Sequence, residues 1–188
     1  MEVLGPYYSH TLMNAMLSHS VRWCKRNPKI REQLKSYDDG DLFSRQARTL
    51  LFEEVTTGHA TVPTVQTLLL LSAQECSNGN RTQAWLYSGM AFRLIEDMGI
   101  FIDGQKYAGS VSLSDEDIEI RNRLFWSCYF WDKIICLYLG RSPTLQHSNV
   151  SPPQIMSKLI MPLGFHFAAT NGFQWMIRPK VSSGLPMA

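Results

Sequence analysis

The side chains of this 188-residue chain that could do chemistry are its cysteines, its histidines and a few neighbouring carboxylates. Thiolates and imidazoles could hold zinc, and paired carboxylates could act as a general acid and base. The four cysteines are Cys24, Cys76, Cys128 and Cys136. Because they are widely spaced and form no Cys-x-x-Cys pair, zinc ligation has no local support. We interpret them as small buried hydrophobic residues in a reducing compartment.

The histidines and carboxylates form no catalytic pattern either. The histidines are His10, His19, His59, His147 and His166. No two have the spacing of a metal-binding helix face, and the sequence contains no nucleophile elbow, P-loop or dinucleotide fingerprint. The acidic groups 53–54 and 115–117 fall at expected helix ends, where capping or solvation explains them better than catalysis. We therefore expect no enzyme activity and no cofactor bound by this chain.

One acid, Asp132, stands alone within the apolar, aromatic stretch 119–141. Burying an unpaired carboxylate is very costly, so Asp132 needs partners that satisfy its charge. The stretch predicts a helix over 115–139, capped by Ser114 at its start and ended by Gly140. The charge at Asp132 and the short apolar run argue against a membrane span. We expect a buried helix with a satisfied polar group inside it.

The remaining elements that must position this helix are also predicted to be helical. Apolar residues at spacings of three and four predict helices over 9–23, 41–55, 63–76 and 84–98. The short turn 77–80 predicts an antiparallel αα-hairpin, because so few residues can only fold one helix back on the other. Ser88, Gly89 and Ala91 would allow its helices to approach closely. The predicted fold class is all-α, with antiparallel αα-hairpins around a long central helix.

The first predicted helix ends in a cluster of basic residues. Its stripe consists of Leu12, Met16, His19 and Trp23, and the cluster consists of Arg22, Lys25, Arg26, Lys29 and Arg31. One interpretation is a nuclear-import or phosphate-contacting patch. The other is a cationic helix C-terminus, which the helix dipole favours in any case. We favour the second interpretation, since short Lys/Arg-rich motifs are often false positives.

Length and composition suit one globular domain. The chain is 45% hydrophobic and has a formal net charge of +2, which is too small to indicate nucleic-acid binding by itself. The N-terminus lacks a signal-peptide pattern, so we expect an intracellular, soluble protein. We place the domain at 1–153 and expect it to be incomplete. We expect an irregular tail at 154–188, where prolines and glycines interrupt any helical period.

Five blocks in order resemble a known family. They are LMNAMLSHS, RQARTLLFEE, TVPTVQTLLLLSAQECSNGNRTQAWLYSGMAFRLIEDMGI, EIRNRLFWSCYFWDK and LGRSPTL. The chain resembles the fungal-specific transcription factor domain, the middle homology region of zinc binuclear cluster transcription factors. Within that family it is most similar to the nitrate-assimilation and xylanolytic activator types. The signature residues are Gly89, Ala91, Arg93, Gly99, Arg123, Phe125, Trp126, Asp132, Gly140 and Arg141.

The resemblance implies a regulatory domain of a nuclear transcription factor. It implies contacts with proteins of the transcription machinery or within the same protein, and it allows a homodimer of the full-length protein. Zinc and DNA would be bound by an N-terminal cysteine cluster that this chain lacks. A helical adaptor or small-ligand scaffold without a transcriptional role is the alternative.

The resemblance also suggests a partner for Asp132. Asn122 and Lys133 stand where the family often has arginines, whereas Arg121, Arg123 and Arg141 remain. We hypothesise that Asp132 pairs with one of these arginines and so fixes the packing of the long helix.

Overall fold

The computed structural model describes Gly5 and residues 7–101 and 113–145, and every regular element in these ranges is helical. The elements are α1 (His10–Cys24), α2 (Pro28–Leu34), the 3-10 helix η1 (Lys35–Gly40), α3 (Asp41–Thr56), α4 (Val62–Ser77), α5 (Arg81–Asp97) and α6 (Asp115–Leu139). The predicted all-α fold class is confirmed. The expected domain boundary at residue 153 and the tail lie outside the described residues.

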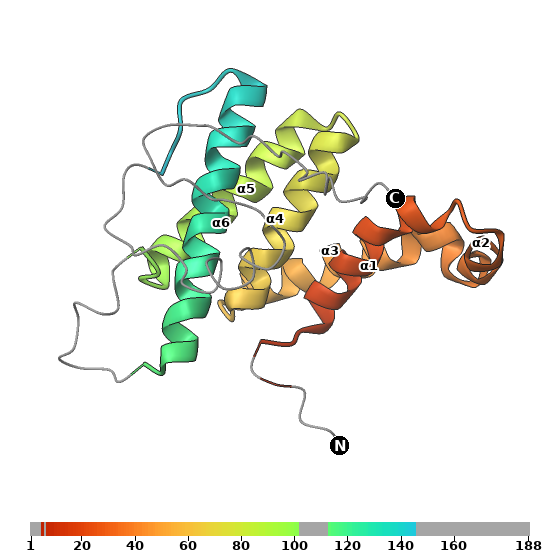
Figure 1. The fold of residues 1–188 in the computed structure, drawn as a ribbon, viewed down its shortest axis with the longest axis horizontal. Coiled ribbons are helices and arrows are strands. Elements are labelled where there is room, and N and C mark those ends of the chain that lie inside the picture. Colours follow the sequence, from red (N-terminus) through yellow and green to blue (C-terminus); the bar gives the residue numbers. More distant parts are fainter. Residues whose placement is uncertain (1–4, 6, 102–112, 146–188) are drawn as a thin grey trace, which may run out of the picture.

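Helices α4 and α5 form the predicted antiparallel hairpin, visible in yellow and yellow-green in Figure 1. The backbone N–H of Asn80 donates to the carbonyl of Glu75 at 2.9 Å, which closes the turn between the helices. Ser88 and Ala91 are fully buried, as expected for close packing. Gly89 was wrongly predicted to join them, since a Cβ at this position would meet no atom within 4 Å.

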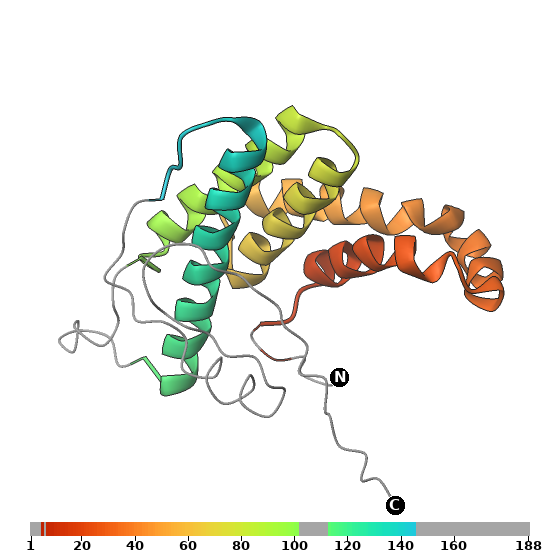
Figure 2. The same cartoon turned by 45° about the horizontal axis from the view of Figure 1, so that its top comes forward.

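Helices α1 and α3 form a second antiparallel pair, which extends away from α4, α5 and α6 and carries α2 at its far end (Figure 2). Small or polar side chains, Thr11, Ala15 and Ser18, form the buried face of α1. Gly40 starts α3 with φ +97°, and a Cβ there would lie 2.6 Å from a methyl group of Val21. Only glycine fits at this position, because both the backbone conformation and the space exclude a side chain.

Helix α6 packs along α5 and α4 and buries one face against them. Phe125 and Cys128 join the main core with Phe92 of α5, whereas Ile135 packs with Ala84 in a smaller cluster. Because α4 also contacts α1 and α3, α4 lies in the middle of the group and α6 lies at one side. Within the described part of the chain, no helix is long and apolar enough to cross a membrane.

Candidate functional site

The carboxylate of Asp132 is completely buried and accepts hydrogen bonds from four groups. The backbone N–H groups of Thr144 and Leu145 donate to it, each at 3.0 Å. The ammonium of Lys133 lies 2.9 Å from the same carboxylate, and the thiol of Cys136 donates at 3.6 Å. We call Asp132, Lys133, Thr144 and Leu145 the Asp132 cluster. Its charge-assisted bonds offset the cost of desolvating the carboxylate.

The hypothesis that an arginine pairs with Asp132 is wrong. Arg121 instead donates to the carbonyls of Met98 at 3.0 Å and Gly99 at 2.9 Å, at the end of α5. Arg123 forms an ion pair with Glu119 at 2.9 Å, one helical turn away. The Arg141 guanidinium lies 4.4 Å from the ring centre of Trp85. The charge of Asp132 is balanced by Lys133, its neighbour in sequence.

Lys133 joins the helix to the segment that follows it. Its ammonium donates to the carbonyl of Leu145 as well as to Asp132. It also lies 4.3 Å from the ring centre of Tyr129, within the range of a cation–π contact. Because Asp132 and Lys133 bind the N–H and the C=O of the same residue, Leu145, the two side chains clamp its backbone.

The turn at the end of α6 brings Leu145 back to this clamp. Gly140 adopts the left-handed conformation predicted for it, with φ 66° and ψ 42°. The N–H of Arg141 then donates to the carbonyl of Cys136 at 2.9 Å, which closes the helix end. Leu145 is buried in the main core. The Asp132 cluster therefore fixes the path of the chain after α6.

A second buried acid, Glu75, was missed by the sequence reasoning. Its side chain is 2% exposed, and it accepts hydrogen bonds from Arg48 at 2.5 Å and from the Asn80 amide at 2.6 Å. These bonds join α3, the end of α4 and the turn before α5. The one available signal was an isolated Glu at the end of the apolar run 68–76, five residues before the last asparagine of the turn.

Smaller polar contacts join the helices at two further points. Glu54 of α3 accepts from the hydroxyls of Thr11 in α1 and Thr64 in α4. The indole N–H of Trp131 donates to Ser72 at 2.9 Å, and the Ser72 hydroxyl donates to the carbonyl of Ala84 at 2.7 Å. Glu54 thus joins α3 to α1 and α4, which differs from the capping or solvation expected for it.

Two of the cysteines, Cys128 and Cys136, are buried as expected, whereas Cys24 and Cys76 are only partly buried. All four are free thiols. Burial raises the pKa of Cys128 to about 12, and the nearby negative charge of Asp132 adds to the shift. Burial and then Asp132 also raise the pKa of Cys136. A thiol with a raised pKa is a poor nucleophile and a poor metal ligand at neutral pH. Among the described residues, no three His, Cys, Asp or Glu side chains form a group that could hold a metal ion.

The histidines are scattered. His10 lies 3.3 Å from the hydroxyl of Tyr8, and the buried Nδ1 of His19 has no hydrogen-bond partner among the described residues. His59 is exposed in the loop before α4. His147 and His166 lie outside the described residues. The structure thus brings no two of the described histidines into one site.

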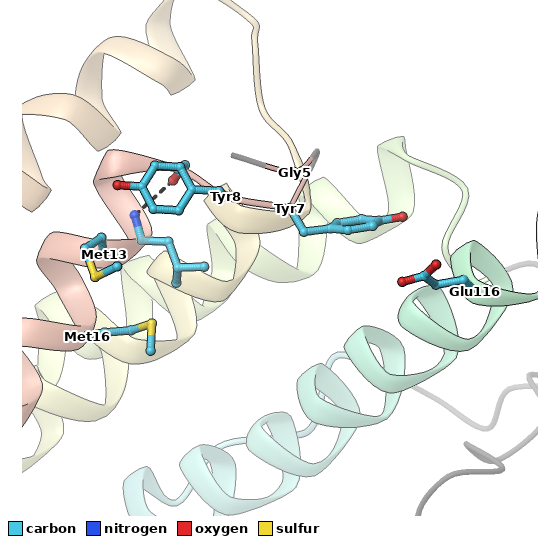
Figure 3. Close-up of a pocket in the computed structure, with 8 residues that line it drawn as sticks. Gly5, Tyr7, Tyr8, Met13, Met16 and Glu116 are labelled. Carbon is cyan, nitrogen blue, oxygen red and sulfur yellow. Dashed lines mark hydrogen bonds between the residues drawn. The ribbon is translucent and has the colours of Figure 1, made fainter. Parts of the chain in front are cut away.

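A shallow hollow lies between the N-terminal end of α1 and the start of α6. It has a volume of about 470 Å³ and is lined by Gly5, Tyr7, Tyr8, Ser9, Leu12, Met13, Met16 and Glu116. Figure 3 shows Met13 and Met16 projecting from α1 beside Tyr8, and Tyr7 pointing toward Glu116. The hollow could not be predicted from the sequence, because it depends on contact between segments that are far apart in the chain.

The hydroxyl of Tyr7 ties the segment before α1 to α6 by donating to Asp117. This hydrogen bond, together with burial and the carboxylate charge, raises the pKa of Tyr7. The hydrogen bond from Ser114 and then that from Tyr7 lower the pKa of Asp117. The two shifts have the signs expected when a phenol donates to an ionised carboxylate.

Comparison with known proteins identifies the family. A family model described as the fungal specific transcription factor domain matches residues 4–180. The chain belongs to this family. It is 34% identical over 153 residues to the nitrogen assimilation transcription factor nirA of Emericella nidulans, covering 79% of this chain and 16% of that protein.

Other relatives bear similar names. The TY1 enhancer activator of Saccharomyces cerevisiae is 35% identical over 137 residues, which cover 70% of this chain and 18% of the relative. The nitrogen assimilation transcription factor nit-4 of Neurospora crassa is 31% identical over 148 residues, which cover 79% of this chain and 13% of the relative. The chain thus spans less than a fifth of each of these proteins. No solved structure matches it. Family and relatives place the chain among regulators of transcription.

The ten residues predicted as a signature of the fungal transcription factor domain fall into two regions. Gly89, Ala91, Arg93 and Gly99 lie in α5 or at its end, and the other six lie in α6 and the turn after it. Arg93 is on the surface and pairs with Glu96 at 3.0 Å. Gly99 has φ 61°, and its carbonyl accepts from Arg121. That these residues mark the family stays a prediction.

The aromatic members of the predicted signature belong to the core. Phe125 is buried, and the ring of Trp126 meets it edge-on with centres 5.8 Å apart. Both rings also contact Tyr129, with centres 6.1 Å and 5.4 Å away. Together with the Asp132 cluster, these residues hold α6 and the chain after it in one arrangement. In this chain, the part of α6 that contains the predicted signature residues serves the packing of the helix.

Proposed function

We propose that this chain is a regulatory, non-catalytic module of a nuclear transcription factor. Family membership supports a role in transcriptional regulation. The proposal that the module is non-catalytic is supported by the hydrogen bonds of its two buried acids. Asp132 and Glu75 both accept hydrogen bonds from groups that hold helices or turns together. Carboxylates committed in this way are not available as acids or bases.

Protein contacts, rather than contacts with DNA, are the proposed mode of action of this module. Helix α6 exposes Phe130, Leu137 and Tyr138, and Leu137 is 82% exposed. Exposed apolar side chains at helical spacing favour contact with another protein surface. The partner is a component of the transcription machinery, another part of the same protein or a second subunit.

Zinc and DNA binding are assigned to another part of the whole protein. The four cysteines of this chain lie on three separate helices, and Cys128 and Cys136 are buried in the packing of α6. Neither the spacing nor the surroundings fit a zinc site. We propose that the cysteine cluster implied by the family binds zinc and DNA, and that this chain modulates the outcome.

A transcription reporter tests the proposal. The 188-residue chain is inserted between an unrelated DNA-binding domain and a strong activation domain, and the reference fusion has a flexible linker of equal length. A regulatory module is expected to change reporter output several-fold relative to the linker at equal protein level. The Asp132→Ala variant is expected to lose this effect, since the effect requires the folded module.

Equal output from the chain and the linker would contradict a regulatory role. The alternative, a scaffold for small ligands without a transcriptional role, would give equal output together with a ligand-dependent rise in melting temperature.

A further inference from the structure

Helix α1 turns its apolar side chains to solvent. Met13, Met16, Leu17 and Trp23 are all exposed, and Met16 and Trp23 expose 50% and 66% of their surface. Residues three, four and seven apart share one side of a helix, so these four form a continuous surface, which we call the α1 stripe. The side packed on α3 and α4 carries small and polar residues instead.

This arrangement reverses the usual pattern of a surface helix, whose apolar side faces the core. The predicted stripe of Leu12, Met16, His19 and Trp23 is therefore not a core stripe, because two of its members are largely exposed. Thr11, Ala15 and Ser18 are the residues of α1 that are buried in the packing of the helices. The side chains of the α1 stripe take no part in this packing. Flexible methionine side chains are common on surfaces that bind peptides.

The α1 stripe continues into the hollow at the N-terminal end of α1. Met13 and Met16 belong to both, and Tyr7, Tyr8 and Leu12 complete the apolar wall (Figure 3). The volume of about 470 Å³ lies within the usual range of binding pockets. A hollow of this size beside an exposed apolar stripe can receive one large side chain of a segment that lies along the helix.

The opposite end of α1 is strongly basic. Residues 10–31 include Arg22, Lys25, Arg26, Lys29 and Arg31 but no Asp or Glu, although the whole chain has a net charge of only +2. All five cations are exposed. The next acid, Glu32, forms its ion pair with Lys35 at 2.8 Å. We call these five cations the basic end, and their excess positive charge attracts an anionic partner.

We propose that the α1 stripe and the basic end bind an acidic, amphipathic peptide segment of a partner protein. Its apolar side chains cover the stripe, one of them enters the hollow, and its carboxylates pair with the basic end. This corresponds to recognition of an amphipathic helix by an apolar surface. The inference rests on α1, the residues around its two ends and the start of α2, and it does not depend on a role in transcription.

Other occupants fit these observations less well. A second copy in a symmetric contact would bring two basic ends together, and such like-charge contacts are costly. Nucleic acid would pair with the cations but would leave the methionines of the stripe uncovered. An anionic membrane would press against Glu116, whose carboxylate lines the hollow.

Fluorescence anisotropy with the purified 188-residue chain tests the proposal. The probe is a fluorescein-labelled synthetic peptide with Leu and Phe at helical spacing and with Asp and Glu at the remaining positions, most of them near one end. One comparison peptide has Lys in place of every acid, and another has Ser in place of every apolar residue. Only the first peptide is expected to bind, and added salt is expected to weaken its binding.

Variants locate the binding surface. Met16→Ser and the double variant Lys25→Glu/Arg26→Glu are each expected to weaken binding about tenfold or more. The matched controls are Leu86→Ser, an exposed apolar residue on α5, and Arg81→Glu, an exposed cation on the same helix. Both controls are expected to bind as the unmodified chain does. Circular dichroism confirms that each variant is folded, which exposed positions should allow.

Three results would overturn the proposal. The first is the absence of binding to the acidic peptide. The second is equal weakening by the α1 variants and the controls. The third is that a random-sequence DNA duplex, or phosphatidylcholine–phosphatidylserine vesicles, bind more tightly than the acidic peptide and that the α1 variants lose this binding. Selective loss of peptide binding in the α1 variants alone supports it.

Discussion

Replacing Asp132 by alanine should severely destabilise the fold, because the carboxylate satisfies several buried groups at once. The variant leaves the N–H groups of Thr144 and Leu145 without their acceptor. Leu145 is buried, and an unsatisfied buried N–H group costs about 1–3 kcal/mol, whereas Thr144 is exposed and its N–H can bind water. The ammonium of Lys133, whose side chain is 17% exposed, also loses its counter-charge. We expect a total loss of about 3–5 kcal/mol in the free energy of unfolding, as for other broken buried pairs.

Urea denaturation followed by far-ultraviolet circular dichroism measures this loss. A domain is typically stable by only about 5–15 kcal/mol, so Asp132→Ala could leave too little folded protein to measure. Asp132→Asn keeps the shape and one acceptor oxygen, and it is expected to lose about 1–3 kcal/mol. Asp97→Ala, at an exposed acid on α5, is the control and should stay within about 0.5 kcal/mol. An Asp132→Ala protein as stable as this control would refute the reasoning.

Four further substitutions test other parts of the structure, all by urea denaturation. Gly140→Ala should lower the free energy of unfolding by about 1–2 kcal/mol, because alanine is strained at φ 66°. Gly89→Ala should raise it by about 0.5–1 kcal/mol, because alanine favours the helix and its Cβ meets no atom within 4 Å. Glu75→Gln should lower the free energy of unfolding by about 1–3 kcal/mol. An unchanged stability would mean that the ion pair between Glu75 and Arg48 contributes nothing. Tyr7→Phe should lower stability at neutral pH. The difference in free energy of unfolding between Tyr7→Phe and the unmodified chain should shrink as pH falls below 3.8, the ordinary pKa of Asp117. The reason is that the hydrogen bond from Tyr7 stabilises the ionised carboxylate, which is lost when Asp117 is protonated.

The bounds of α6 could be predicted from the sequence because the signals are local. Ser114 accepts a hydrogen bond from the N–H of Asp117, and Gly140 adopts the left-handed conformation at the other end. Both depend only on residues within a few positions, so the predicted range 115–139 agrees with the structure. The α4–α5 hairpin was predictable for the same reason, since its turn is too short for another path.

The partner of Asp132 could not be predicted, because the choice depends on where the chain returns after the helix. The sequence offered three arginines nearby, and charge alone made each a reasonable candidate. The turn at Gly140 brings two backbone N–H groups onto the carboxylate instead, and Lys133 reaches the same place. Backbone donors carry no sequence signal, so this solution is visible only in three dimensions.

The sequence by itself determined that this chain is helical, where α6 begins and ends, and that an acid within α6 had to be satisfied, but it did not predict α2 and η1. Those properties follow from spacing, capping and the cost of burying charge, which act locally. Only the tertiary structure decided which side of each helix faces the core. In α1 the apolar side faces solvent, because small residues such as Ala15 and Ser18 allow the close approach of α3 and α4. Periodicity defines the two sides of a helix, but the packing of its neighbours decides which one is buried.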